Sequence, residues 1–312
     1  MKSRNRNKDL LKAAQGLKKE LAGRIEERVL MKRYTTFKIG GICDVMVFPK
    51  NREDLAKTIE YCESRGLPWM ILGRGSNLLV LDQGLDELVI NLQDGFKEVS
   101  FDENGIVRAQ AGVRLAHLVK QCQDEGLSGL EFCAGIPGTV GGAIKMNAGA
   151  QGSEIGEWLK SVEFYRYPEG NYHRKRDELK FEYRQVSLKK DEIVLGGEFA
   201  LKQEDPRRIR AVILEYLKKR RQTQPVSYPS AGSIFKNPPG DYAGRIIEEL
   251  GLKGYRIGDA QVSDIHANFI VNRGRAKARD VLELIKLIQQ KARREKGIEL
   301  ELEIEVVGKA ND

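Results

Sequence analysis

Apolar residues recur three and four positions apart in several parts of the chain, which is the spacing of one buried face of an α-helix. Local signals support two helices, because Asn51 suits an N-cap position and Pro206 suits the first helical position. The basic run at residues 218–221 favours a helix end, where the helix dipole stabilises cations. We predict helices over residues 8–29, 51–64, 113–126, 206–221, 243–250 and 278–294.

Runs rich in Val, Ile, Leu and Phe lie between these helices and are typical of strands. Asn104-Gly105 and Pro168-Glu169-Gly170 each separate two such runs and indicate hairpin turns. The last run alternates five aliphatic residues with four glutamates, which predicts one continuous strand with an apolar face and an acidic face. The predicted strands span residues 43–49, 68–72, 88–92, 98–101, 106–109, 162–166, 193–201 and 298–306.

The composition describes a folded chain. Of its 312 residues, 41% are hydrophobic and 31% are charged, enough for two or three domains with buried cores. No apolar run approaches the ~18 residues of a membrane span, and residues 1–30 lack the apolar core and cleavage site of a secretory signal. We therefore expect a cytoplasmic protein. The basic first helix is expected to pack on the protein body, with binding to a membrane surface as the alternative.

The sequence offers few residues in the spacing that a metal site requires. The four cysteines show no C-x-x-C spacing, and the three histidines do not cluster. The net charge of +8 suits polyphosphate ligands, nucleic acid and anionic lipid equally. The basic run at residues 218–221 could contact nucleic acid, but no known DNA-reading or RNA-reading motif accompanies it. A helix end is therefore the better interpretation of that run.

The first of two glycine-rich stretches, residues 73–79, follows a predicted strand. Leu78 stands where a dinucleotide-binding fingerprint has its third glycine, and a strand follows instead of a helix. The stretch is therefore not a Rossmann fingerprint. Successive backbone N–H groups, together with Ser76 and Asn77, can still bind a phosphate. A plain turn between strands is the alternative.

The second glycine-rich stretch, residues 135–149, contains five glycines together with Thr139 and Asn147. Without side chains, such a backbone lets a large, flat or phosphorylated ligand approach closely. A purely structural loop rarely needs so many glycines. We interpret this stretch as a ligand-binding surface.

Residues 229–238, which we call the serine loop, read Pro-Ser-Ala-Gly-Ser-Ile-Phe-Lys-Asn-Pro. Loops that present hydroxyl, lysine and amide groups from a rigid scaffold often carry catalytic chemistry. One alternative is a tight connection whose Ser and Asn side chains bond their own backbone. Another is a hydrolase that uses Ser233 with His266. The chain has no Gly-x-Ser-x-Gly turn for such a nucleophile, and a hydrolase leaves the glycine stretches unexplained.

Six motifs, taken together and in this order, resemble the UDP-N-acetylenolpyruvoylglucosamine reductase family, flavoenzymes of peptidoglycan precursor synthesis. Any one motif is weak, whereas six in order are highly specific. The resemblance extends from residue 34 to residue 308, which is nearly the whole chain. The motifs lie at residues 34–41, 73–79, 135–143, 229–238, 261–269 and 300–303.

The resemblance implies an α+β fold, with an FAD-binding domain of the vanillyl-alcohol-oxidase (PCMH) type and a smaller α+β substrate-binding domain. The implied parts are an N-terminal helix (1–32), the FAD domain with two subdomains (33–205), the substrate domain (206–297) and a C-terminal strand (298–312). The chain has no large insertion before the serine loop, which resembles the shorter, type II form of the family. That form lacks a tyrosine-bearing loop over the substrate, so what covers the substrate stays open.

The resemblance also implies the site residues. Ser233 would be the general acid, and Arg184 and Glu303 would stabilise the enol intermediate. Glu303 is selected by alignment from among four neighbouring glutamates. The implied contacts of a non-covalently bound FAD are Thr36, Leu72, Gly73, Arg74, Gly75, Ser76, Asn77, Leu78, Gly135, Ile136, Pro137, Gly138, Thr139, Gly141, Gly142, Ala143, Asn147 and Gly149. The implied substrate contacts are Tyr228, Lys236, Asn237, Gln261 and His266.

The implied reaction converts UDP-N-acetylglucosamine enolpyruvate to UDP-N-acetylmuramate. NADPH would deliver hydride to flavin N5, and this hydride would then reach C3 of the enolpyruvyl ether. A fixed arginine can stabilise the charge that spreads onto the substrate carboxylate. A serine can protonate C2 because the enolate beside it is basic. The implied partners are this substrate and NADPH, without nucleic acid or a membrane span, in a monomer or weak homo-oligomer.

Two residues depart from the family pattern. Lys145 lies within the second glycine stretch, at a position where an aromatic residue is expected, and Asp259 replaces a small residue. Two rival functions stay open. One is an oxidase of the same flavin fold that acts on a small alcohol or sugar. The serine loop is evidence against this oxidase. The other is a basic nucleic-acid-binding module.

Overall fold

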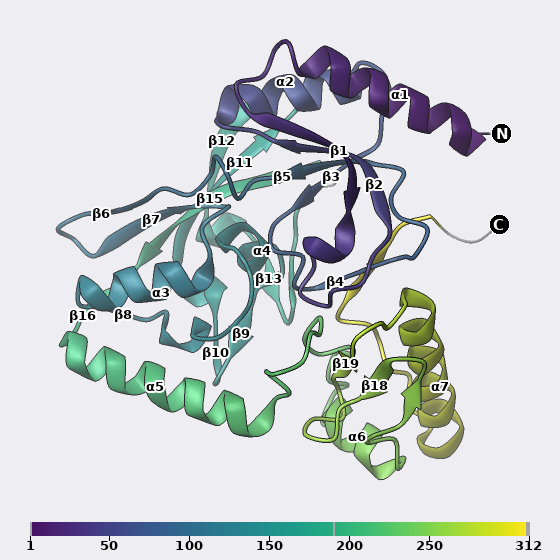
Figure 1. The fold of residues 1–312 in the computed structure, drawn as a ribbon. Helices are drawn as coiled ribbons and strands as arrows, with labels where there is room; N and C mark the ends of the chain where they lie inside the picture. Colours follow the sequence, from purple (N-terminus) through teal and green to yellow (C-terminus); the bar gives the residue numbers. More distant parts are fainter. Residues whose placement is uncertain (1, 190, 310–312) are drawn as a thin grey trace. The chain divides into compact units, whose positions relative to one another are not determined.

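The structure, a computed structural model, describes residues 2–189 and 191–309. It divides into two compact units (Figure 1). The first contains the described residues up to Glu27, Val45–Arg74 and Glu87–Lys218, and the second contains Arg28–Asp44, Gly75–Asp86 and the described residues from Lys219 onward. Two N-terminal segments thus belong to the same unit as the C-terminal third. The domain boundaries implied by the sequence stay a prediction.

A four-stranded sheet covered by two helices forms one layer pair of the first unit (Figure 1). Across the sheet the strands are β1 (Arg24–Leu30), β2 (Ile42–Phe48), β5 (Leu88–Asn91) and β3 (Trp69–Leu72). Strands β2 and β3 run parallel to β5. Helices α1 (Lys2–Leu17) and α2 (Arg52–Glu63) contribute Leu10 and Leu55 to the buried cluster that contains Ile90 of β5. The Asn51 side chain accepts the Asp54 N–H, which confirms the predicted cap of α2.

The predicted helix at residues 8–29 is wrong beyond Leu17, because α1 ends there and the chain then forms β1. The chain turns at Ala22 and Gly23, whose N–H groups donate to the Asp54 carboxylate at 3.0 and 2.7 Å. A Cβ at position 23 would lie 2.1 Å from the carbonyl oxygen of Phe48, so only glycine fits. These tertiary contacts end the helix although the helical apolar spacing continues, since propensity is a weak constraint.

An antiparallel five-stranded sheet forms the second layer of the first unit. Its strands, in order, are β12 (Gly170–Lys175), β11 (Leu159–Arg166), β15 (Ile193–Ala200), β7 (Ile106–Gln110) and β6 (Val99–Phe101). The β6–β7 and β11–β12 pairs confirm the two predicted hairpins. Gly196 and Gly197 do not interrupt β15, because they pair with Gln110 and Ala109 of β7.

Three helices complete the core on this sheet: α3 (Leu115–Asp124), α4 (Val140–Lys145) and α5 (Pro206–Thr223). They contribute Leu118, Ile144 and Ile209 to one buried cluster. A Cβ at Gly197 would lie 2.9 Å from the Ile144 side chain, so this glycine lets α4 pack directly on the sheet. The sequence does not predict α4, because glycines disfavour a helix. The second glycine stretch contains this six-residue helix.

Short elements complete the first unit. The strand pairs are β8 (Leu127–Ser128) with β16 (Lys202–Gln203), β9 (Gly149–Ala150) with β10 (Ser153–Glu154), and β13 (Phe181–Glu182) with β14 (Gln185–Val186). The single-turn helices are η2 (Glu131–Cys133), η3 (Ile155–Glu157) and η4 (Arg176–Glu178). The β9–β10 and β13–β14 pairs carry residues of the candidate site.

The second unit packs two helices against short strands (Figure 1). Helices α6 (Ala243–Glu249) and α7 (Ala278–Lys296) bury Ile247 and Leu284 with Val262 and Ile270. The strands are β17 (Arg256–Ile257), β18 (Ala260–Val262) and β19 (Ile270–Asn272) in one antiparallel sheet, and β4 (Leu78–Val80) parallel to β20 (Glu305–Val307). The single turn η1 (Met31–Arg33) precedes β2.

The predicted continuous strand at residues 298–306 is wrong. Only β20 is a strand, and the chain bends at Glu303 and the residue that follows it. The bend separates two hydrogen-bonding partners: the Glu303 N–H donates to the Ile234 carbonyl at 2.8 Å, whereas the Glu305 N–H donates to the Asn77 carbonyl at 2.9 Å. The alternation correctly indicates which side chains are buried, but it does not predict the change of partner.

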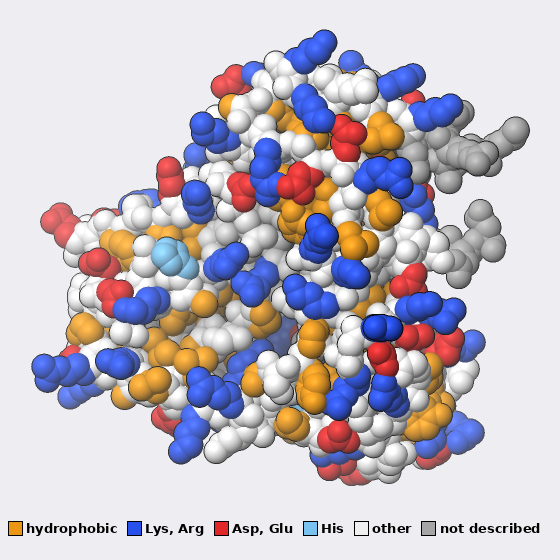
Figure 2. All heavy atoms as spheres, in the orientation of Figure 1, with side chains coloured by type: hydrophobic (Ala, Val, Ile, Leu, Met, Phe, Trp, Pro, Cys, Tyr) orange, Lys and Arg blue, Asp and Glu red, His pale blue; other side chains and the backbone are white. Residues whose placement is uncertain are grey.

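Basic and acidic side chains are mixed on the surface. Figure 2 shows Lys and Arg scattered over both units on the face in view, with Asp and Glu between them. Within the described residues, no helix is long and apolar enough to cross a membrane. The same residues contain no group of three or more His, Cys, Asp or Glu that could hold a metal ion.

Candidate active site

The serine loop lies in the second unit between two other backbone segments. Ser233 forms an isolated antiparallel bridge with Phe269, and Phe235 forms one with Leu302. The loop turns at Gly232, whose φ of 80° is a left-handed conformation that glycine adopts without strain. The segments around Phe269 and Leu302, both far along the chain from Ser233, therefore hold it in place.

The Ser233 hydroxyl is available to a ligand. Its side chain is partly exposed. Among residues 2–189 and 191–309, no protein group forms a hydrogen bond with Ser233 Oγ. A serine that only stabilises its own turn would bond the nearby backbone. The plain structural interpretation of this residue is therefore weakened.

Glu303 is the least exposed of the four terminal glutamates, being partly buried while the other three are exposed. Its N–H donates to the carbonyl of Ile234, the residue after Ser233, at 2.8 Å. Its own carbonyl accepts the Asn77 Nδ2 at 3.0 Å. The second unit thus brings together Ser233, Glu303 and the end of the first glycine stretch.

Thr36, a predicted cofactor contact, lies between the serine loop and the first glycine stretch. Its hydroxyl donates to the Ser230 carbonyl at 2.7 Å, and its N–H donates to the Gly75 carbonyl at 3.2 Å. Gly75 has φ 60°, and a Cβ there would lie 2.3 Å from the carbonyl oxygen of Tyr34. Glycine is required at this position by close backbone packing. The side of the serine loop that bonds Thr36 therefore adjoins the first glycine stretch.

In the first unit, the start of the first glycine stretch meets the second stretch. A Cβ at Gly73 would lie 2.5 Å from Oγ1 of Thr139, which is buried. A Cβ at Gly141 would lie 2.8 Å from that of Ala111. These two glycines are explained by packing within the protein. Gly135, with φ 80°, is exposed and takes a conformation that glycine favours.

Gly142 has no such packing reason. It is exposed on α4, and a Cβ there would meet only the Thr139 hydroxyl, at 3.7 Å, within 4 Å among the described residues. The space above this glycine is open. A ligand that lies flat on α4 would explain why the position carries no side chain.

Arg184, predicted to stabilise the intermediate, occupies the two-residue turn between β13 and β14. Its φ is 58°, an uncommon conformation for a residue other than glycine. Nη2 donates to the Gly149 carbonyl at 3.1 Å, and Nη1 lies 3.9 Å from Glu154 Oε1. Non-glycine residues in such conformations persist where the surrounding structure imposes them, often at functional sites.

Asn147 and Glu154 support this arginine. Asn147 is 1% exposed, its Oδ1 accepts the Gly156 N–H at 3.1 Å, and its Nδ2 donates to Glu154 Oε2 at 2.6 Å. Its amide is therefore occupied by protein partners, and its contact with FAD stays a prediction. Glu154 links Asn147 to Arg184. No sequence signal identifies Glu154, because it is one of many glutamates and lies 30 residues before Arg184.

Two predicted substrate contacts have structural partners. The Asn237 Oδ1 accepts the N–H of Ala243, the first residue of α6, at 3.1 Å. Gln261 donates from Nε2 to the Gly254 carbonyl at 3.2 Å. Their amides hold the local backbone, and any substrate contact would use what remains of their hydrogen-bonding capacity.

The other three predicted substrate contacts also have neighbours within the protein. Lys236 lies 3.4 Å from the exposed Glu301 carboxylate. Tyr228 is exposed, with the Arg273 guanidinium 4.3 Å from its ring centroid. His266 accepts the Asn268 N–H at Nδ1, at 3.2 Å. Burial, with a smaller contribution from nearby Lys253, lowers the pKa of His266, so its neutral form is favoured.

The remaining predicted cofactor contacts fall in the two glycine stretches. Those in the first unit are Leu72, Arg74, Ile136, Pro137, Gly138, Ala143 and Gly149, and those in the second are Ser76 and Leu78. Of the two departures from the family pattern, Lys145 is exposed at the end of α4. Asp259 accepts the Arg275 N–H at 2.9 Å, and this hydrogen bond lowers its pKa.

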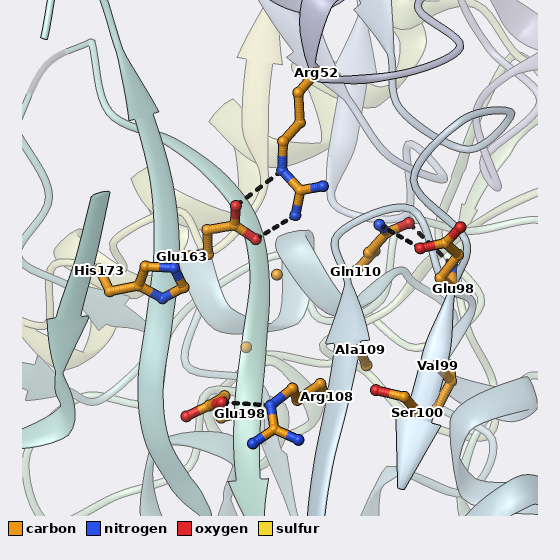
Figure 3. A pocket seen from close by; sticks show the side chains of 12 residues that line it. Arg52, Glu98, Val99, Ser100, Arg108, Ala109, Gln110, Glu163, His173 and Glu198 are labelled. Carbon is orange, nitrogen blue, oxygen red and sulfur yellow. Dashed lines mark hydrogen bonds and ion pairs between the residues drawn. The ribbon is translucent and has the colours of Figure 1, made fainter. Parts of the chain in front are cut away.

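A hollow on the five-stranded sheet lies apart from the predicted site residues. It encloses about 440 Å³ and is lined by β6, β7, β11, β12 and β15, none of its residues being a predicted site residue (Figure 3). Arg52 binds Glu163 through two hydrogen bonds of 2.9 and 2.7 Å, and Arg108 binds Glu198 at 2.6 Å. Both arginines are already paired, so the hollow offers no unpaired arginine to an anionic ligand.

Two family models match the chain. One, described as an FAD binding domain, matches residues 43–175. The other, described as the C-terminal domain of UDP-N-acetylenolpyruvoylglucosamine reductase, matches residues 224–307. The predicted fold class, α+β with an FAD-binding domain followed by a smaller domain, is confirmed by these matches and by the similar crystal structure described next.

Several proteins of one enzyme family are similar to this chain over most of its length. UDP-N-acetylenolpyruvoylglucosamine reductase from Syntrophomonas wolfei is 44% identical over 287 residues, 91% of this chain and 95% of its own. The reductase from Moorella thermoacetica is 44% identical over 278 residues, 89% of this chain and 91% of its own. The crystal structure of the Thermus caldophilus reductase is 42% identical, with a TM-score of 0.80 over 91% of this chain and 99% of that chain. This chain therefore belongs to the UDP-N-acetylenolpyruvoylglucosamine reductase family.

Proposed function

We propose that this FAD-dependent oxidoreductase reduces UDP-N-acetylglucosamine enolpyruvate to UDP-N-acetylmuramate with NADPH, in the synthesis of peptidoglycan precursors. The observation that carries the proposal is the serine loop. Ser233 presents a hydroxyl without a protein partner among the described residues, and the adjacent peptide is hydrogen-bonded to Glu303. Family membership supports the same substrate.

The residues of the two glycine stretches fit FAD. The open, exposed position above Gly142 is the observation that supports this fit, because protein packing does not account for the glycine. Gly135 and Gly142, both exposed, would let the cofactor approach the backbone of the second glycine stretch closely. When bound, FAD supplies the hydride chemistry that connects NADPH with the substrate.

Arg184 would stabilise the charge that develops on the substrate. Addition of hydride to C3 breaks the C2–C3 π bond and leaves an electron pair at C2 that spreads onto the carboxylate. A guanidinium held by Gly149 and Glu154 can bind that carboxylate without moving during the reaction. Preorganised charge of this kind lowers the barrier most in a site that excludes water.

Ser233 would complete the reaction by donating its hydroxyl proton to C2, after which solvent reprotonates the alkoxide. A serine is a weak acid, but the carbanionic centre is a strong base, so the transfer is favourable. Glu303 would bind the enol form of the substrate carboxylate. Lys236, Tyr228 and His266 would contact the rest of the substrate.

The proposed function is tested by the two half-reactions of the purified holoenzyme. Anaerobic addition of NADPH should bleach the flavin band at about 450 nm, and later addition of UDP-N-acetylglucosamine enolpyruvate should restore it. Bleaching without recovery would retain the flavoenzyme and exclude the substrate. In an oxidase of the same fold, oxygen would instead restore the band of the reduced flavin, and this substrate would not.

Gly142→Ala should weaken FAD binding without weakening the fold. The added methyl group projects into the open space above α4, and we expect the dissociation constant of FAD to rise on the order of tenfold, about 1.4 kcal/mol. In a helix the substitution itself is favourable by about 1 kcal/mol, so the apoprotein should be at least as stable. Titration of apoprotein with FAD measures the affinity, and thermal unfolding of the apoprotein measures the stability.

Gly141→Ala is the matched control. It gains the same helix propensity, but its methyl group would lie 2.8 Å from the Ala111 Cβ, closer than two such atoms pack. The apoprotein of this variant should therefore unfold at a lower temperature than that of Gly142→Ala. Unchanged FAD affinity in Gly142→Ala would remove α4 from the cofactor surface.

A further inference from the structure

One buried side chain holds the serine loop by an unusual set of contacts. Asn268 is 3% exposed. Its Oδ1 accepts the Phe235 N–H at 3.0 Å, and its Nδ2 donates to the Phe235 carbonyl at 2.8 Å. Its backbone carbonyl accepts the Ile234 N–H at 2.9 Å. Three hydrogen bonds therefore join Asn268 to the two residues that follow Ser233.

The Asn268 amide replaces a strand partner at this point. On one side of the loop two backbone hydrogen bonds flank the Phe235–Leu302 bridge: the Glu303 N–H donates to the Ile234 carbonyl and the Lys236 N–H donates to the Glu301 carbonyl, both at 2.8 Å. On the other side, next to the Ser233–Phe269 bridge, the Asn268 side chain supplies the donor and the acceptor that Phe235 needs. An amide side chain combines a donor and an acceptor at this spacing at every pH, whereas a carboxyl of the same shape does so only when it is protonated.

We propose that Asn268 is a positioning residue for Ser233, which fixes where the Ser233 hydroxyl points during protonation of C2. This inference rests on the proposed function, in which Ser233 is the general acid. The Ser233 hydroxyl has no protein partner of its own in the described part of the chain, so the loop backbone sets its position. A misplacement of about 1 Å can lower the rate of such a step about 100-fold.

Asn268→Asp tests the proposal because aspartic acid has nearly the shape of asparagine but loses its donor on ionisation. The protonated side chain accepts from the Phe235 N–H and donates its O–H to the Phe235 carbonyl, as the amide does. The ionised side chain turns an oxygen toward that carbonyl and repels it. Burial raises the pKa of such a carboxyl, so both forms should be reached between about pH 6 and about pH 9.

The measurement is rapid mixing of each half-reaction across this pH range in the holoenzyme. In Asn268→Asp the substrate-reduction step should be about 10–100-fold slower than the parent near pH 9 and should recover toward the parental rate near pH 6. The NADPH half-reaction, which does not use Ser233, should stay within about twofold of the parent. Amide exchange of Ile234 and Phe235, measured without substrate, should accelerate at high pH.

Asn272→Asp is the matched control. Asn272 is also 3% exposed, and its amide binds the Gly274 N–H at 2.8 Å, the Ala276 N–H at 3.1 Å and the Phe37 carbonyl at 3.1 Å. Its side chain makes no hydrogen bond to the serine loop among the described residues. It should lose stability at high pH without a selective loss of the substrate-reduction step.

The titratable side chains around Asn268 are present in both variants, so they do not explain a difference in pH profile. They are His266, whose Nδ1 accepts the Asn268 N–H, and Lys236, Glu301 and Glu303 on the loop and on its other neighbour. A difference in pH profile between Asn268→Asp and Asn272→Asp therefore arises from ionisation of the side chain at position 268.

Equal slowing of both half-reactions in Asn268→Asp, or no slowing at pH 9, would overturn the proposal. If that variant does not fold at high pH, Asn268→Ser decides: selective slowing of substrate reduction at every pH supports the proposal, and equal effects on both steps overturn it. Ser233→Ala is assayed alongside. If it retains the substrate-reduction step, the role of Ser233 in the proposed function is wrong whatever Asn268 does.

Discussion

Ser233→Ala is expected to lower the rate of substrate reduction by about 10²–10⁴-fold, the usual contribution of a positioned general acid. The methyl group cannot donate a proton to C2, while the loop backbone that holds position 233 is unchanged. Reduction of the flavin by NADPH should proceed at the parental rate. Single-turnover measurements of the two half-reactions separate these steps.

Ser230→Ala is the control for this variant. It removes the other hydroxyl of the same loop, but the contact of Ser230 with Thr36 uses the Ser230 backbone carbonyl and survives the substitution. Turnover should remain close to that of the parent. If Ser233→Ala and Ser230→Ala behaved alike, the loop would be structural and another residue would supply the proton.

Arg184→Gly is expected to abolish most activity without weakening the fold. Removal of one preorganised charge from an anionic transition state costs about 10²–10³-fold in turnover. Stability should change little, because glycine relieves the φ of 58° while the hydrogen bond to Gly149 is lost, two effects of about 1 kcal/mol each with opposite sign. Steady-state kinetics and denaturant unfolding of the same preparation provide both numbers.

Gln151→Gly is the control for backbone strain. Gln151 also has a positive φ, 55°, and lies in the β9–β10 turn of the same unit. It should be at least as stable as the parent and retain activity. A large loss of stability in Arg184→Gly would mean that the arginine is a structural residue of its turn, and the proposed role in charge stabilisation would lose its support.

Patterns of local spacing correctly predicted most elements of the fold. The buried runs of β2 and β5, the turn at Asn104-Gly105 and the Asn51 cap of α2 all depend on residues within a few positions of one another. Such interactions can be inferred from sequence because their geometry is set by the periods of helix and strand.

The predicted elements were wrong where contacts with residues distant in the sequence determine the path of the backbone. Apolar spacing favours a helix through residue 29, but the Asp54 carboxylate binds the backbone at Ala22 and Gly23 and turns the chain. Alternation favours a straight strand at residues 298–306, but the chain exchanges Ile234 for Asn77 as its partner and bends. In α4, packing against the five-stranded sheet overrides the low helix propensity of two glycines.

The family, the two glycine stretches and the serine loop could be read from the sequence, because they are contiguous motifs. The contacts of single residues within them came from the folded structure: Gly73 and Gly141 serve packing while Gly142 faces open space, and Asn237 and Asn147 hold backbone. It also revealed Glu154 beside Arg184 and Asn268 beside the serine loop. Side-chain contacts between residues 30 and 33 positions apart leave no periodic trace in the sequence, since they form only when folding brings the two segments together.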